Sequence, residues 1–230
     1  YLVENYAVAL SQGLQLIAPK PLAQERLTAL AAGLTDPPED PKNFASLPGV
    51  KTEFQAMQQS GIKMTELMNQ AFTKQSLKTQ MNSAPFNVVH LATHGQFSSQ
   101  AKETFILAAD GRINVDDLDD LLRNRNQTRS EAVELLVLSA CQTALGDNRA
   151  ALGLAGVAVR AGARSTLASL WQIDDQSTAL LIGEFYRELS KGQITKAEAL
   201  RRAQVTLLKT NPSYSKPSYW APYVLLGNWL

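Results

Sequence analysis

Residues 134–146 read ELLVLSACQTALG, and this stretch determines the expected fold. Four consecutive apolar residues, 135–138, predict a short strand that is buried on both faces of a sheet. The strand ends at Ser139-Ala140-Cys141, and Cys141 is the only cysteine of the chain. In open α/β sheets, chemistry collects just outside the carboxyl ends of the strands, so this position favours a nucleophilic thiol. The alternative is a small buried hydrophobe, which is the usual role of a free cysteine.

A second stretch, residues 86–95, reads FNVVHLATHG and predicts another buried strand, 88–91, that ends close to His94-Gly95. His94 lies 47 positions before Cys141, and if the two strands are parallel neighbours both residues lie at one edge of the sheet. An imidazole can take the proton of a thiol or stabilise the thiolate as an ion pair. Gly95 lacks a Cβ, so its backbone N–H can approach an oxyanion closely. The two stretches together predict a His–Cys dyad with a reactive thiol.

Several segments, in order, carry a family resemblance: HLATHG, LSACQTALG, GLAGVAVRAGARSTLASLWQIDD and, at the end, YWAPYVLLGNW. These segments resemble the CHAT domain, the caspase-like module that is found beside tetratricopeptide repeats and is akin to caspases and separases. The resemblance covers the chain from about residue 29 to the C-terminus. Caspases carry Gln-Ala-Cys-x-Gly around the nucleophile, whereas this chain has Ser139-Ala140-Cys141-Gln142-Thr143. The caspase preference for an acidic substrate residue is therefore not implied.

The resemblance implies a caspase-like sandwich: a mostly parallel sheet of about six strands, with helices on both faces and small β-hairpins. It also implies a cysteine endopeptidase that cleaves protein or peptide substrates with His94 and Cys141 and needs no cofactor. We expect the backbone N–H groups of Gly95 and Cys141 to bind the oxyanion. No third, orienting residue can be named from the sequence. Control by a neighbouring tetratricopeptide-repeat or sensor region is also implied, with weak activity in the isolated domain.

Substrate preference is predicted from the segment 170–175, LWQIDD, which follows an apolar strand near the expected nucleophile. The segment resembles the corresponding part of separases, where an acid lines the pocket for a basic residue. Asp175 is the first candidate for that acid and Asp174 the second, so cleavage after Arg or Lys is expected. The alternative is that Asp175 caps the helix that follows, a role worth about 1 kcal/mol. The two roles do not exclude each other.

The bulk composition describes an ordinary soluble α/β protein. The 230 residues suit one domain, 1–230, in which 1–28 form an edge segment; 45% of residues are hydrophobic and 19% charged. A formal net charge of +1 gives no argument for nucleic-acid or membrane binding, and no apolar run approaches the ~20 residues that span a bilayer. One cysteine excludes an internal disulfide and suits a reducing cytoplasm. The opening YLVENYAVAL lacks Met and a signal pattern, as expected for a domain cut from a longer chain.

A metal site is not expected. His90 and His94 are the only histidines, and on a strand they lie about 13 Å apart on the same face, too far to share one ion. We therefore interpret His90 as a packed strand residue. The four aspartates in DDLDDLLR, residues 116–123, suit a helix start because they match the helix dipole, although a cation site is the alternative.

The remaining pattern alternates strands and helices, which favours a mostly parallel sheet that is covered on both faces. Further core strands are expected at 27–34, 64–68, 165–173 and 223–226, helices at 51–59, 73–81, 116–123, 150–161, after Asp174-Asp175 and at 195–209, hairpins within 6–17 and 105–115, and a proline-rich loop at 36–48.

Two other function classes are alternatives to a peptidase. An inert caspase-shaped scaffold that binds partner proteins would be favoured by loss of His94 or Cys141, and both are present. A nucleotide-binding domain would need a glycine-rich phosphate loop after an early strand, and the chain has neither common pattern. The peptidase is the leading hypothesis, with the scaffold second.

Overall fold

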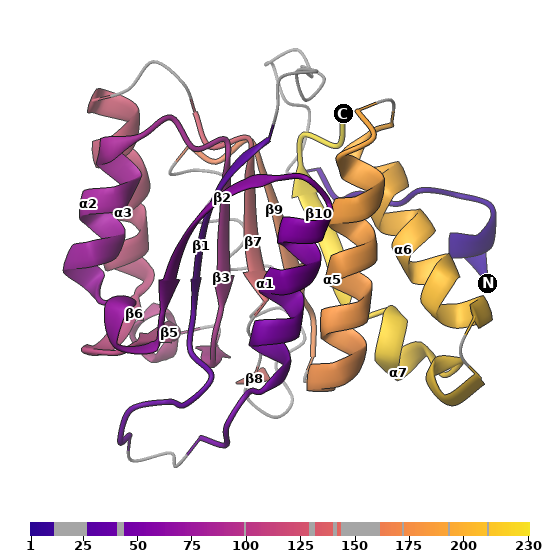
Figure 1. Cartoon of the computed structure of the whole chain (residues 1–230), viewed down its shortest axis with the longest axis horizontal. Helices are drawn as coiled ribbons and strands as arrows, with labels where there is room; N and C mark the ends of the chain where they lie inside the picture. The colour runs from indigo at the N-terminus through magenta and orange to yellow at the C-terminus, as the bar shows by residue number, and fades with distance from the viewer. Residues whose placement is uncertain are drawn as a thin grey trace.

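A six-stranded sheet forms the centre of the computed structural model, which describes residues 1–11, 27–40, 44–98, 100–128, 132–139, 142–143 (backbone), 162–171, 173–192, 194–210 and 212–230. The strand order is β10-β9-β7-β3-β1-β2 (Figure 1). The strands are β1 (Thr28–Gly33), β2 (Lys63–Met68), β3 (Val88–Ala92), β7 (Leu135–Ser139), β9 (Ser165–Ser169) and β10 (Tyr223–Gly227). The first five are mutually parallel, and β10 runs antiparallel to β9.

Helices cover both faces of this sheet (Figure 1). On one face lie α2 (Lys74–Ser83) and α3 (Val115–Thr128); on the other lie α1 (Gly49–Gln59), α5 (Asp175–Leu189), α6 (Lys196–Thr210) and α7 (Pro217–Trp220). Successive side chains of a strand point to opposite faces. In β7, Leu136 and Leu138 pack with the first group of helices and Leu135 and Val137 with the second. Because the strands are buried on both faces, they appear in the sequence as continuous apolar runs.

A second, four-stranded sheet has the order β6-β5-β4-β8. Its strands are β4 (Gly95–Phe97), β5 (Phe105–Ala108), β6 (Gly111–Asn114) and β8 (Gln142–Thr143), and four short 3-10 helices, η1 (Leu2–Glu4), η2 (Asn69–Ala71), η3 (Ala101–Glu103) and η4 (Pro212–Tyr214), complete the described elements. The predicted hairpin is confirmed, because β5 and β6 pair antiparallel around Gly111, whose φ is +129°. Glycine suits this turn because other residues rarely adopt a positive φ.

The predicted core strands and most of the predicted helices are confirmed, with differences at their ends. The strand expected at 165–173 ends at Ser169, because the chain then turns toward the start of α5. The helix expected at 116–123 continues to Thr128, which adds more than one turn. The helix expected at 150–161 lies outside the described residues.

The N-terminal segment contacts the outer edge of β10. The backbone of Leu10 makes an isolated bridge to Leu226, with its N–H 2.8 Å from the carbonyl oxygen of Leu225 and its own carbonyl 2.9 Å from the N–H of Gly227. The hairpin expected within 6–17 has its second arm outside the described residues. None of the helices in the described ranges is long and apolar enough to cross a membrane.

Candidate active site

The edge of the sheet where β3 and β7 end brings the two predicted reactive stretches together. Ala92, the last residue of β3, pairs with Ser139, the last residue of β7. Immediately afterwards the chains pair again in the small sheet, where Gln96 of β4 is the parallel partner of Gln142 of β8. The segment that contains His94 is thus paired on both sides: before His94 with the residue that precedes positions 140–141, and after His94 with the residue that follows them. Cys141 itself lies outside the described residues.

His94 follows β3 and is half-buried. Its Nε2 lies 2.6 Å from the carbonyl oxygen of Ala45. A carbonyl oxygen can only accept a hydrogen bond, so Nε2 carries the hydrogen and, in the neutral ring, Nδ1 is left as the basic nitrogen. The imidazole also stacks on Phe44, with ring centroids 4.7 Å apart and planes 25° apart. These contacts hold the ring in one tautomer and one plane.

The electrostatic surroundings favour the neutral form of His94. Burial lowers the pKa of His94 below its ordinary value of 6.5, because a charged ring is poorly solvated there. The hydrogen bond to Ala45 and the negative charge of Asp175 act in the opposite direction and raise the pKa by smaller amounts. The net direction is downward, which favours the neutral imidazole.

The described ends of the proline-rich segment 36–48 are anchored beside this edge. The Nε and Nη2 of Arg112 donate to the two carboxylate oxygens of Asp40 at 2.9 and 2.8 Å. The guanidinium of Arg112 lies 4.1 Å from the centroid of the Phe105 ring, and Phe44 packs edge-on against the same ring. These contacts position the segment so that the carbonyl of Ala45 lies next to His94.

Sequence reasoning missed Phe44 and Ala45. The contact of Ala45 is made by its backbone carbonyl, which every residue possesses, so no side-chain pattern could have revealed it. An aromatic residue between prolines was the one available signal, and its meaning depends on the strands below it.

Asp174 and Asp175 begin α5, and each has a hydrogen-bond partner. The carboxylate of Asp174 is exposed and accepts the N–H of Ser177 at 2.8 Å, so Asp174 is the cap of the helix that follows. Asp175, for which that cap was the alternative role, instead accepts the N–H of Gly49 at 2.6 Å. Gly49 is the first residue of α1, so the half-buried Asp175 joins the starts of two helices. A Cβ at Gly49 would lie 2.6 Å from the Asp175 carboxylate carbon, which explains the glycine.

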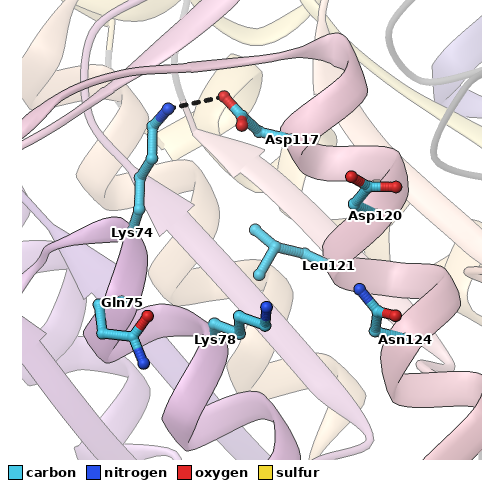
Figure 2. A pocket seen from close by; sticks show the side chains of 7 residues that line it. All are labelled: Lys74, Gln75, Lys78, Asp117, Asp120, Leu121 and Asn124. Carbon is cyan, nitrogen blue, oxygen red and sulfur yellow. Dashed lines mark hydrogen bonds and ion pairs between the residues drawn. The ribbon is translucent and has the colours of Figure 1, made fainter.

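A polar pocket lies elsewhere, between α2 and α3 (Figure 2). Its lining residues are Lys74, Gln75, Lys78, Asp117, Asp120, Leu121 and Asn124. The Nζ of Lys74 lies 2.8 Å from Asp117, and Asp117 also accepts the N–H of Asn114 at the start of α3. Within the described part of the chain, no three His, Cys, Asp or Glu side chains form a group that could hold a metal ion. The pocket lies on the sheet face opposite α1 and α5, and its lining does not include His94.

The mostly parallel six-stranded sheet with helices on both faces defines a caspase-like α/β fold. A solved structure of the Arg specific cysteine proteinase gingipain R matches 88% of this chain and 46% of its own with a TM-score of 0.58 and 11% identity. The complex of the pro- and mature domains of RgpB from Porphyromonas gingivalis matches 89% and 47%, with a TM-score of 0.55 and 12% identity. At such low identity the likeness concerns the fold alone.

The family follows from the sequence comparison. The CHAT domain model matches residues 1–228, so the chain belongs to the CHAT domain family. Tetratricopeptide repeat protein 28 of Mus musculus is 33% identical over 101 residues, and its counterpart from Homo sapiens is 30% identical over 98 residues. Each alignment covers 42% of this chain and 4% of the relative's length, so the chain corresponds to a small part of those proteins.

Proposed function

We propose that this domain is a cysteine endopeptidase in which Cys141 attacks the scissile carbonyl and His94 transfers the proton. The observation that carries the proposal is the double backbone pairing at the sheet edge, which encloses positions 94 and 141. The oriented imidazole of His94 adds the chemistry that a dyad needs.

The two backbone pairings, Ala92 with Ser139 and Gln96 with Gln142, limit how far the short segments between them can separate. Between Ala92 and Gln96 lie three residues, 93–95; between their partners Ser139 and Gln142 lie two, 140–141. Consecutive Cα atoms are about 3.8 Å apart, so neither short segment can extend far from the other. This supports a Cys141 thiol within reach of the Nδ1 of His94.

The proposed reaction uses the tautomer that Ala45 selects. Nδ1 takes the thiol proton, the thiolate adds to the scissile carbonyl, and the imidazolium then protonates the departing amine. Water hydrolyses the resulting thioester after giving a proton to the same nitrogen. The Ala45 carbonyl stabilises the imidazolium, because the Nε2–H bond strengthens when the ring is charged. The backbone N–H groups of Gly95 and Cys141 are the proposed donors to the oxyanion.

Labelling with an electrophilic peptide, such as a peptidyl chloromethyl ketone, tests the proposal. We expect the native parent to be alkylated once, and much faster than the same chain unfolded in urea, while Cys141→Ala is not labelled. A native thiol that reacts no faster than the unfolded one would contradict the proposal and favour the inert scaffold. A longer chain that includes neighbouring tetratricopeptide repeats, with its ligand, is expected to label faster than the isolated domain.

The proposed substrate preference is a basic residue before the scissile bond, with Asp175 as the pocket acid. Its charge acts on His94, so the carboxylate belongs to the same region, and one structural neighbour is named an Arg specific proteinase. One oxygen of Asp175 binds Gly49, but a carboxylate has about four acceptor positions and can serve both partners. An acidic substrate residue would be repelled.

Peptides that end in Arg, Lys, Asp or Leu test this preference in the parent and in Asp175→Asn. The asparagine keeps an oxygen for the N–H of Gly49 and removes only the charge. We expect kcat/KM for the Arg and Lys peptides to fall roughly 10- to 100-fold, the worth of one charge-assisted hydrogen bond, with little change for Leu. Asp174→Asn is the matched control. A preference for Asp, or a basic preference that Asp175→Asn leaves unchanged, would remove Asp175 from the pocket, and Asp174 would be tested next.

A further inference from the structure

A network of buried polar side chains lies beneath the candidate active site, on the sheet face that α1 and α5 cover. Its members are Glu53, His90, Ser139, Tyr186 and Tyr223, each at most 6% exposed. His90 is buried as the sequence predicted, but its polar partners had no sequence signature. Its Nδ1 lies 3.0 Å from the hydroxyl of Tyr186, and the hydroxyls of Ser139 and Tyr223 are 3.1 Å apart.

Glu53 is the member that contacts both strands of the candidate site. Its Oε1 lies 2.9 Å from the Nε2 of His90 on β3, and its Oε2 accepts the hydroxyl of Ser139 on β7 at 3.2 Å. His90 lies on β3, four residues before His94, and Ser139 ends β7, two positions before Cys141 in the sequence. One carboxylate therefore joins α1 to the middle of β3 and to the end of β7.

The same helix follows directly after the segment that orients His94. Ala45 lies four residues before Gly49, where α1 begins, so a shift of α1 along the sheet would move the Ala45 carbonyl relative to His94. The other contacts of α1 with the sheet are largely apolar: Val50, Phe54 and Met57 are buried on that face. Apolar packing is non-directional, whereas the contacts of a carboxylate depend on distance and angle.

We propose that Glu53 is a positioning residue for His94: by joining α1 to His90 and Ser139, it sets where α1 lies and so holds the Ala45 carbonyl against the imidazole. The inference rests on the proposed role of His94 in the dyad. A role in stability alone would be a weak reason to retain a buried acid here, since well-packed apolar residues often replace buried ion pairs without loss. The hydrogen bond from Ser139 at the end of β7, together with the close approach of Glu53 to His90 within β3, accounts for a carboxylate here.

The chain has only two histidines, so NMR of the protein with labelled imidazoles can read His94 directly. His94→Ala assigns the two signals. In the parent we expect His94 to be the Nε2–H tautomer. In Glu53→Gln we expect a mixture of both tautomers and alkylation of Cys141 at least tenfold slower. If the peptides are hydrolysed, kcat should fall with little change in KM.

Met57→Ala is the matched control, because Met57 lies one turn further along α1 on the same buried face and its side chain packs in the apolar core. It should lower Tm at least as much as Glu53→Gln while keeping the parent tautomer and alkylation rate. The proposal is overturned if Glu53→Gln keeps the parent tautomer, or if Met57→Ala disturbs it equally.

If Glu53→Gln does not fold, Ser139→Ala replaces it as the test variant. The alanine removes only the hydrogen bond from Ser139 to Glu53 and the one between Ser139 and Tyr223. A smaller loss of the Nε2–H tautomer is expected, and an unchanged tautomer would overturn the proposal. These readouts separate the two proposals. If His94→Ala leaves the alkylation rate of Cys141 unchanged, the dyad fails, while the tautomer comparison still decides the role of Glu53.

Discussion

Replacing either His94 or Cys141 by alanine is expected to lower kcat/KM for peptide hydrolysis by about 10³-fold or more, and replacing both should lower it no further. The reason is that a nucleophile and its base act as one unit: without Nδ1 to take the proton the thiol is a weak nucleophile, and without the thiol the imidazole has nothing to activate. Steady-state hydrolysis by the two single variants and the double variant measures this.

The pH dependence of the parent adds a second readout to the same experiment. Burial lowers the pKa of His94 below its ordinary value of 6.5. The imidazole therefore loses its proton, and becomes a base, at a pH below 6.5, so the acidic limb of the kcat/KM profile should lie below 6.5. Asp175 raises the pKa of His94, so Asp175→Asn should move the acidic limb to lower pH.

The pH dependence of Cys141 alkylation is a separate measurement. Its midpoint should lie below the free-thiol pKa of ~8.5 in the parent and close to that value in His94→Ala. Additive losses in the double variant, or two alkylation curves with the same midpoint, would contradict the dyad.

Replacing Gly227 by alanine is expected to cost about 2–4 kcal/mol of unfolding free energy, the largest loss of stability that we predict for a single added methyl group. Gly227 ends β10 with φ +89°, which other residues rarely adopt, and a Cβ there would lie 2.4 Å from the carbonyl oxygen of Arg164. The carbonyl belongs to the backbone and accepts the N–H of Asn228, so it cannot move aside without breaking that bond. Urea unfolding measures the loss.

Gly61→Ala is the control for Gly227→Ala, because it separates strain from close approach. Gly61 has nearly the same φ, +85°, but nothing lies within 4 Å of a Cβ at that position. It should cost about 1 kcal/mol, from backbone strain alone. If Gly227→Ala costs no more than Gly61→Ala, the close approach of β10 to Arg164 does not contribute to stability.

The sequence by itself was sufficient for the strands that carry the candidate site. β3 and β7 are buried over their whole length and mostly apolar because helices cover both faces of the sheet, and burial on both faces can be recognised locally as a continuous apolar run. The ends of these strands then followed, and so did the expectation that His94 and Cys141 belong to one edge. The amphipathic helices α5 and α6 were predicted for the same reason: whether a residue is buried depends largely on its own position in a periodic element.

The tertiary structure alone decided which groups meet at that edge. The carbonyl of Ala45 contacts His94 across 49 positions, Glu53 contacts Ser139 across 86, and Asp175 contacts Gly49 across 126. The antiparallel direction of β10 was not evident from the sequence either, because a short apolar run does not indicate in which direction the strand runs in the sheet. Periodicity records whether a side chain is buried, but a polar partner is set by strand order and helix placement. Those depend on the packing of the whole chain, and they decide how His94 is held.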